Sequence, residues 1–118
     1  MTMMERYVPL PGYEDFYEIS NLGKIKSLDL RDEGRIMKFE LDRSGYLVIK
    51  LTRFGIRKKH AIHKLVYTTF NGDLLPGDIV HHKDEDKLNN ANTNLLTVNA
   101  TEYRRMHSKS LKPIYVTI

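Results

Sequence analysis

Short runs of alternating apolar and polar residues fill the first half of the chain, and turn residues separate them. Because such alternation is typical of strands, the pattern predicts strands over 16–20, 24–28, 36–41, 46–52 and 56–61. Turns are expected at 21–23 and 54–55, each of which ends in glycine. The strand 46–52 lacks a clean polar face and is expected to be buried. Residues 7–15 are turn-rich and are expected to wrap the surface.

The second half begins with helical spacing. Ile62, Leu65, Val66 and Phe70 predict a helix over 62–70 that ends at the Asn-Gly pair 71–72. A short strand over 79–82 and a polar loop over 83–94 follow. Asn99 and Glu102, spaced as a capping pair, predict a helix over 100–109. The pattern predicts an α+β chain: a small N-terminal antiparallel sheet, then a ββα-like unit.

Charge is segregated along the chain. Residues 1–42 are slightly acidic, whereas residues 43–72 contain no Asp or Glu, and a second basic cluster lies near the C-terminus. Such segregation favours a polyanion as partner, although a solvated basic face is the plain alternative. The absence of cysteine excludes disulfides and thiolate metal sites. No apolar run is long enough to cross a membrane, so a cytoplasmic protein is expected.

Histidines supply the candidate chemistry. His81 and His82 end a predicted strand and therefore point to opposite faces, so one imidazole can bind a metal while the other acts as a base. Tyr103 and His107 lie four residues apart on one face of the last helix, where His107 can meet His81 at one divalent cation. A lone histidine is more often a hydrogen-bonded structural residue, which is the role expected of His63.

Three segments carry a resemblance to a known family. The segment HHKDEDKLNN at 81–90, followed by Asn94-Leu95, resembles the core motif of HNH nucleases, whose fold is a ββα-metal (His-Me finger) unit. The segment HKLVYTTF at 63–70 resembles the preceding helix of phage and intron-encoded HNH homing endonucleases. The segments YVPLPGYE at 7–14 and YEISNLGKIKS at 17–27 resemble the NUMOD-type DNA-binding motif of those proteins.

The resemblance implies a role for each matching residue. His82 matches the general base and Asn94 the middle asparagine that ties the loop together, while His81 and His107 match metal ligands. Tyr103 stands where the family usually has a His or Asn ligand. Three alternatives follow from this difference. The cation (Mg²⁺, Mn²⁺, Ni²⁺ or Zn²⁺) is held by His81 and His107 with water, or Tyr103 packs as an aromatic residue and weakens the site. In the third alternative the site has decayed and the chain only binds DNA.

The resemblance also predicts the organisation and partners. A NUMOD-like region is expected over 1–60, a nuclease core over 61–110 and a tail over 111–118, with double-stranded DNA as the partner and a homodimer or protein partner as an option. The tail is too short for a helix-turn-helix module, so modest sequence specificity is expected. A phage or mobile element acting in a bacterial host is the expected source. The residues expected to contact phosphate are Lys24, Lys26, Arg53, Arg57, Lys58, Lys59, Arg104 and Arg105.

Overall fold

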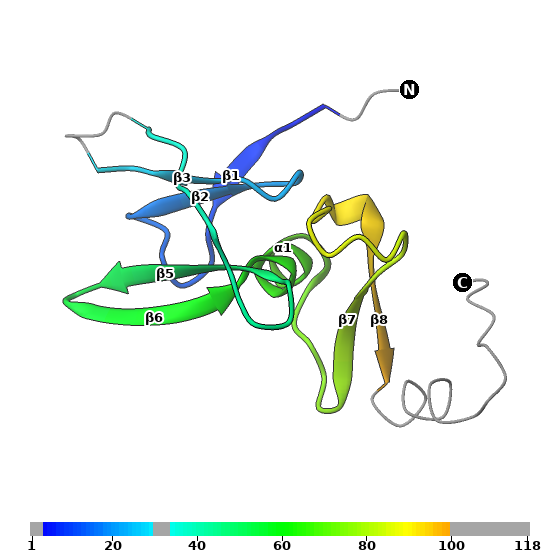
Figure 1. The fold of residues 1–118 in the computed structure, drawn as a ribbon. Coiled ribbons are helices and arrows are strands. Elements are labelled where there is room, and N and C mark those ends of the chain that lie inside the picture. Colours follow the sequence, from blue (N-terminus) through cyan, green and yellow to red (C-terminus); the bar gives the residue numbers. More distant parts are fainter. Residues whose placement is uncertain (1–3, 30–33, 100–118) are drawn as a thin grey trace, which may run out of the picture.

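The computed structural model describes residues 4–29 and 34–99, and it shows three small antiparallel sheets around one helix (Figure 1). The first sheet joins β1 (Tyr7–Pro9), β2 (Tyr17–Ser20) and β3 (Ile25–Ser27) in chain order. Its β2–β3 connection turns at Gly23, whose φ of 91° suits a residue without a side chain.

The second sheet consists of a short strand and a long hairpin. It joins β4 (Glu40–Leu41), β5 (Leu47–Arg53) and β6 (Ile56–Ala61). Helix α1 (Ile62–Asn71) begins directly after β6 and ends at Gly72. Figure 1 shows the β5–β6 hairpin extending away from α1 toward one end of the molecule.

The third sheet is a hairpin that carries the paired histidines. Strand β7 (Asp78–His82) pairs antiparallel with β8 (Leu95–Asn99), and His82 stands opposite Leu95. The connecting loop ends in a 3₁₀ turn, η1 (Asn92–Asn94). Strand β7 and the loop together hold the candidate site.

One apolar core joins the three sheets through α1. Each sheet and the helix contribute fully or almost fully buried side chains to it: Leu10, Ile19, Ile25, Ile49, Leu51, Ile62, Val66, Val80 and Leu95. Because Ile62 and Val66 lie on one face of α1, the helix packs against both β5 and β7. No helix in the described part of the chain has the length and apolar character that a membrane span requires.

The α+β class and most of the predicted elements are confirmed. Two expectations are wrong. Residues 7–9 form an edge strand instead of a surface wrap, because their main chain pairs with β2. The expected strand 36–41 shrinks to residues 40–41, because 34–39 contribute only one isolated bridge, from Ile36 to Lys26. The strand over 46–52, expected to be fairly buried, buries Val48, Ile49 and Leu51 and leaves Lys50 and Thr52 exposed.

The sequence does not predict strand β8, because apolar and polar residues alternate only weakly in its segment LLTVN. It forms because the loop returns the chain beside β7 and all five of its residues pair. The helix expected over 100–109 lies outside the described residues.

Candidate active site and basic hairpin

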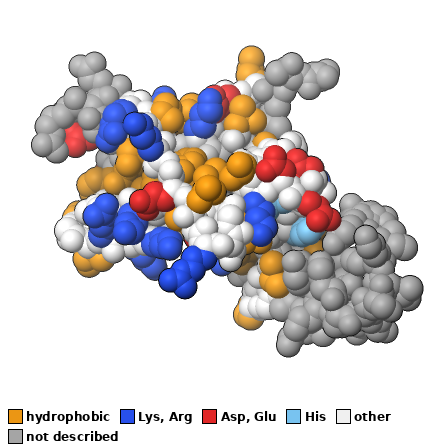
Figure 2. Space-filling model, in the orientation of Figure 1, with side chains coloured by type: hydrophobic (Ala, Val, Ile, Leu, Met, Phe, Trp, Pro, Cys, Tyr) orange, Lys and Arg blue, Asp and Glu red, His pale blue; other side chains and the backbone are white. Residues whose placement is uncertain are grey.

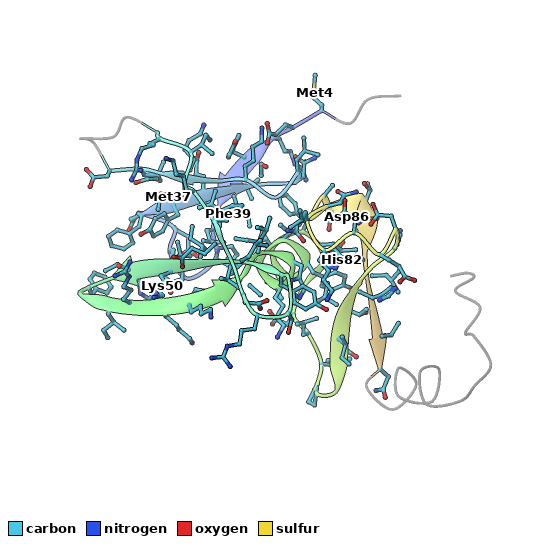
Figure 3. All side chains as sticks on the ribbon, in the orientation of Figure 1. Met4, Met37, Phe39, Lys50, His82 and Asp86 are labelled. Atoms are coloured by element: carbon cyan, nitrogen blue, oxygen red, sulfur yellow. The ribbon has the colours of Figure 1, made fainter. Side chains whose placement is uncertain are left out.

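His82 occupies the buried end of β7. Its side chain is only 4% exposed, and its Nε2 lies 2.7 Å from Oδ1 of Asn90. Figure 3 shows His82 beside the loop that carries Asp86. Because an amide oxygen can only accept, Nε2 carries the hydrogen and Nδ1 of the neutral ring keeps its lone pair. Asn90 therefore fixes which nitrogen of His82 is basic.

Asn94 closes the loop between β7 and β8. Its Nδ2 donates to Oδ1 of Asp84 and to the carbonyl of Asn89, both at 2.9 Å, and its Oδ1 accepts from the main chain of Asp84 at 3.2 Å. Hydrogen bonds from Asn89, from the main chain at Asp86 and from Asn94 hold the pKa of Asp84 below its usual range. The loop is thus fixed on both sides of Asn90.

Two further rings pack against His82. The ring centroid of His63, from α1, lies 5.2 Å from that of His82, and Tyr46, at the start of β5, lies 4.7 Å from His63 and 5.9 Å from His82. Tyr46 is held by its main-chain N–H, which donates to Asp42 at 3.0 Å, and the ammonium of Lys87 lies 4.7 Å from its ring centroid. The ring of His82 therefore contacts two other rings, those of Tyr46 and His63.

Among the described residues, Nδ1 of His63 does not make the buried hydrogen bond expected of this histidine. The residue is 6% exposed, and its Nδ1 is buried without a hydrogen-bond partner among the described residues. Burial, and secondarily the nearby His82, lowers the pKa of His63 to about 4. The ring is therefore neutral at physiological pH.

The turn of the first sheet touches this loop. A side chain at Gly23 would meet Cβ of Asn90 at 3.0 Å and its carbonyl oxygen at 3.2 Å. The neighbouring Asn21 accepts a main-chain hydrogen bond from Asn92 at 2.8 Å. The residue that orients His82 is thus supported from the N-terminal sheet.

The predicted metal ligands are only partly within the described chain. His81 precedes His82 on β7, pairs with Leu96 and points to the opposite face of the hairpin. Its expected companions His107 and Tyr103 lie outside the described residues. Within residues 4–29 and 34–99, no three His, Asp or Glu side chains converge as a metal site.

The β5–β6 hairpin sorts its basic residues by face. Pairing of Lys50 with Lys59 and of Thr52 with Arg57 puts these four exposed residues on one surface, here called the outer face. Arg53 and Lys58 lie on the opposite surface, which continues the buried Ile49 and Leu51. Figure 2 shows Lys and Arg side chains gathered over this hairpin, and Figure 3 places Lys50 on β5 far from His82.

The other predicted phosphate contacts are more dispersed. Lys24 forms an ion pair with Glu5 at 3.8 Å, and the ammonium of Lys26 lies 4.1 Å from the ring centroid of Tyr7. Both lie within or beside the β2–β3 hairpin. Arg104 and Arg105 lie outside the described residues.

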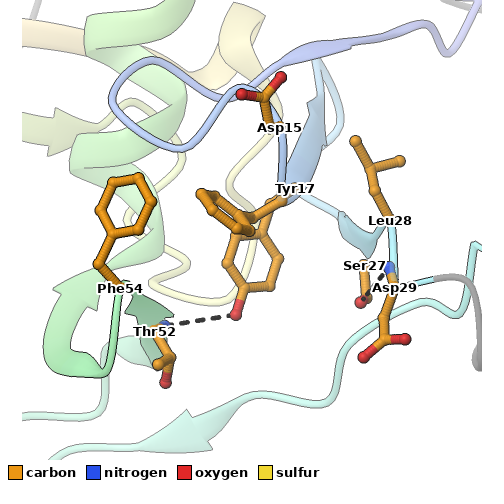
Figure 4. Close-up of a pocket in the computed structure, with 8 residues that line it drawn as sticks. Asp15, Tyr17, Ser27, Leu28, Asp29, Thr52 and Phe54 are labelled. Carbon is orange, nitrogen blue, oxygen red and sulfur yellow. Dashed lines mark hydrogen bonds between the residues drawn. The ribbon is translucent and has the colours of Figure 1, made fainter.

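A cavity of about 490 Å³ separates the first sheet from the tip of the hairpin (Figure 4). Phe16, Tyr17 and Phe54 form its aromatic walls, and the main chain of Thr52 donates to the hydroxyl of Tyr17 at 3.3 Å. Asp15 and Asp29 also line it, so its acidic rim does not suit a phosphate.

Sequence reasoning predicts roles for His82 and Asn94 but does not anticipate the residues that surround His82. It includes Asn90 only as part of the segment at 81–90, and it gives Tyr46 only a position in a predicted strand. The signal for Asn90 is present in the asparagine-rich loop, because an amide is the neutral group that can fix an imidazole tautomer. No local signal marks Tyr46, which reaches His82 only through the tertiary fold.

Comparison with known proteins identifies the class. Residues 5–52 match the family model of the NUMOD4 motif, and residues 60–105 match that of an HNH endonuclease. The chain belongs to the HNH homing endonuclease family and carries an N-terminal NUMOD motif.

Individual relatives agree with this assignment. The DNA endonuclease I-HmuI of Bacillus phage SP01 is 36% identical over 86 residues, which are 73% of this chain and 48% of that protein. The uncharacterized HNH endonuclease L245 of Acanthamoeba polyphaga mimivirus is 38% identical over 81 residues, 69% of this chain and 23% of the viral protein.

A solved structure of DNA binding and cleavage by the HNH homing endonuclease I-HmuI superimposes with a TM-score of 0.74 and 31% identity. The match covers 87% of this chain and 59% of that one. The chain therefore spans about half or less of the length of the curated relatives named here.

Proposed function

We propose that this chain is a metal-dependent DNA endonuclease that hydrolyses phosphodiester bonds, with His82 as the general base. The observation that carries the proposal is the 2.7 Å hydrogen bond between His82 and Asn90 inside a loop closed by Asn94. The three residues lie in the segment that resembles the family's motif, and their contacts suit proton abstraction.

The base needs one free lone pair in a fixed direction. Asn90 holds Nε2 in its protonated form, so Nδ1 of His82 is the nitrogen that takes a proton from the attacking water. The rings of Tyr46 and His63 limit rotation of His82 about its side-chain bonds. Such positioning matters because general-base catalysis contributes roughly 10² to 10⁴ in rate.

The cation is proposed on donor chemistry. An imidazole at His81 suits Mn²⁺, Ni²⁺ or Zn²⁺ and tolerates Mg²⁺ with water in the remaining positions, and His107 is the proposed second ligand. Tyr103 is the doubtful third. When bound, the cation would neutralise charge on the phosphate and its leaving oxygen. The described residues supply one of these ligands, so the ligand set is a prediction for metal-binding measurements.

Double-stranded DNA is the proposed substrate, and the outer face of the β5–β6 hairpin is its proposed main contact. A two-stranded ribbon fits the major groove, and Lys50, Arg57 and Lys59 project from it together. Lys24, Lys26, Arg53, Lys58, Arg104 and Arg105 are proposed as further phosphate contacts.

Nicking of supercoiled plasmid tests the proposal. We expect nicking with Mg²⁺, Mn²⁺, Ni²⁺ or Zn²⁺, its loss in EDTA, and a fall of at least about a hundredfold for His82→Ala with DNA binding retained. His60→Ala is the matched control, because this histidine bonds the hydroxyl of Tyr13 and lies outside the site. Equal nicking by His82→Ala and the native chain would refute the role of the base.

The alternative function has a distinct signature. A native chain that binds DNA but does not nick it, and that gains nicking by Tyr103→His, would be a disarmed relative that acts as a DNA-binding factor. If neither the native chain nor the Tyr103→His variant nicks DNA that both bind, the nuclease proposal is refuted and the binding surface stands.

A further inference from the structure

The tip of the β5–β6 hairpin exposes two large apolar side chains among basic residues. Phe54 is 82% exposed and Ile56 is 72% exposed. Arg53 and Arg57 flank them in sequence, and Lys58 follows. A basic surface that ends in an apolar tip fits a ligand with charged edges and small apolar groups between them.

Phe54 occupies a position that its own backbone disfavours. Arg53 pairs with Ile56, so the turn has two residues, and both have positive φ: 52° at Phe54 and 77° at Gly55. These angles indicate a type I′ turn, in which Asn-Gly is the favoured pair. A bulky aromatic residue is rarely found with positive φ, because its Cβ crowds the backbone. The hairpin alone therefore does not account for a phenylalanine here.

Neighbouring groups hold the ring without covering it. The ring centroid of Phe16 lies 5.6 Å from that of Phe54 in an edge-to-face arrangement, and the guanidinium of Arg53 lies 5.6 Å from the ring centroid of Phe54. Arg53 also donates to the carbonyl of Gly12. An aromatic side chain braced in this way loses little conformational entropy when it meets a ligand.

We propose that Phe54, at the tip of the hairpin, is a base-reading element that packs on thymine methyl groups in the major groove. This inference rests on the proposed DNA-binding function of the hairpin. The groove admits a two-stranded ribbon, the thymine methyl is the exposed apolar group on its floor, and phenylalanine is one of the side chains that reads it. Arg53, Arg57 and Lys58 beside the tip favour DNA over an apolar protein partner, whereas Asp15 and Asp29, which line the cavity between Phe54 and Phe16, would have to face away from the phosphates.

The strand that leads to the tip sets its distance from the cut. Tyr46 packs near His82, and β5 then runs extended to Arg53, immediately before Phe54. At about 3.3 Å per residue, the eight steps from Tyr46 to Phe54 span roughly 26 Å. With base pairs stacked about 3.4 Å apart, a strand of this length spans at most about eight base pairs, so the thymine should lie within about eight base pairs of the cleaved phosphodiester.

Selection from a randomised duplex pool, read without metal, tests the tip directly. The native chain should enrich thymine at one or two positions, and replacing that thymine by deoxyuridine should weaken binding about fourfold, the effect of one buried methyl group. Where cleavage occurs, the enriched position should lie within about eight base pairs of the cleaved phosphodiester. Because both arms measure binding alone, failure of the nuclease proposal does not alter their outcome.

Phe54→Asn separates a reading role from a structural one. Asn-Gly suits the turn, so the variant should melt at the same or a higher temperature, yet it should lose the enrichment and bind the thymine and deoxyuridine duplexes equally. A lower melting temperature with thymine preference intact would assign Phe54 to packing. Equal deoxyuridine sensitivity in both chains would also overturn the proposal.

Two other outcomes would replace the proposal with a different one. A rise in 2-aminopurine fluorescence next to the enriched position would show that the tip unstacks bases and acts as a wedge. Binding to vesicles rich in phosphatidylserine that depends on Phe54, with DNA binding independent of it, would assign the tip to anionic membranes.

Discussion

Replacement of His63 by phenylalanine should make the stability of the protein less sensitive to acid. The folded state holds His63 neutral with a pKa of about 4, whereas the ordinary value is 6.5. Between these values the unfolded chain binds a proton that the folded chain does not, so acid favours unfolding. The phenylalanine would keep a ring against Tyr46 and His82 but would bind no proton.

The magnitude follows from the two pKa values. Lowering the pH from 7 to 5 should cost the native chain about 2 kcal/mol at this one group, and solvent screening at the edge of the ring cluster reduces this to about 1–2 kcal/mol. The cost begins below pH 6.5, grows as the pH falls toward 4, and becomes constant below about pH 4, where both the folded and the unfolded chain bind the proton. The variant should lack this part of the pH dependence.

Urea unfolding at pH 7, 6 and 5 measures the difference. The gap in unfolding free energy between the native chain and His63→Phe should change by about 1–2 kcal/mol in favour of the variant between pH 7 and pH 5. His60→Gln is a useful control, because burial also lowers the pKa of His60 but that ring is only partly covered and bonds Tyr13. Parallel stability curves for the native chain and His63→Phe would refute the reasoning.

Three further changes test the loop, the hairpin and the turn. Asn94→Ala removes bonds to Asp84 and to the main chain, and should lower the unfolding free energy by roughly 2–4 kcal/mol in urea titrations; an unchanged midpoint would show that the amide does not hold the loop. Lys59→Ala should reduce the slope of log affinity against log salt by about 0.9, whereas Lys59→Arg should not; equal slopes for both would remove Lys59 from the contact. Gly23→Ala combines positive φ with a clash at Asn90, and should lower both the melting temperature and the nicking rate; a variant with native values for both would show that the turn yields freely.

Sequence reasoning is sufficient for those features that depend on local pattern. Period and turn chemistry identify the tight turns at Gly23 and Gly55 and the apolar spacing of α1, because each lies within a short stretch of chain. The motif that contains His82 and Asn94 is also local, but it is found through its resemblance to a known family. Strand β8 and the exposed outer face of β5 depend on which chain segment lies alongside, which local alternation does not encode. The packing of Tyr46 on His82 joins residues far apart in the sequence, and no motif anticipates it.

The contact between Gly23 and Asn90 has a consequence for how such proteins can be assembled from parts. The N-terminal sheet completes the loop around His82, because Asn21 accepts the hydrogen bond of Asn92 and Gly23 leaves room for Asn90. A chain started at residue 61 would leave that N–H without its acceptor and one side of the loop bare. An N-terminal sheet taken from a relative should therefore fit only when its turn has the same shape. Because Gly23 has no side chain to collide with Asn90, this one position limits which sheets can be exchanged.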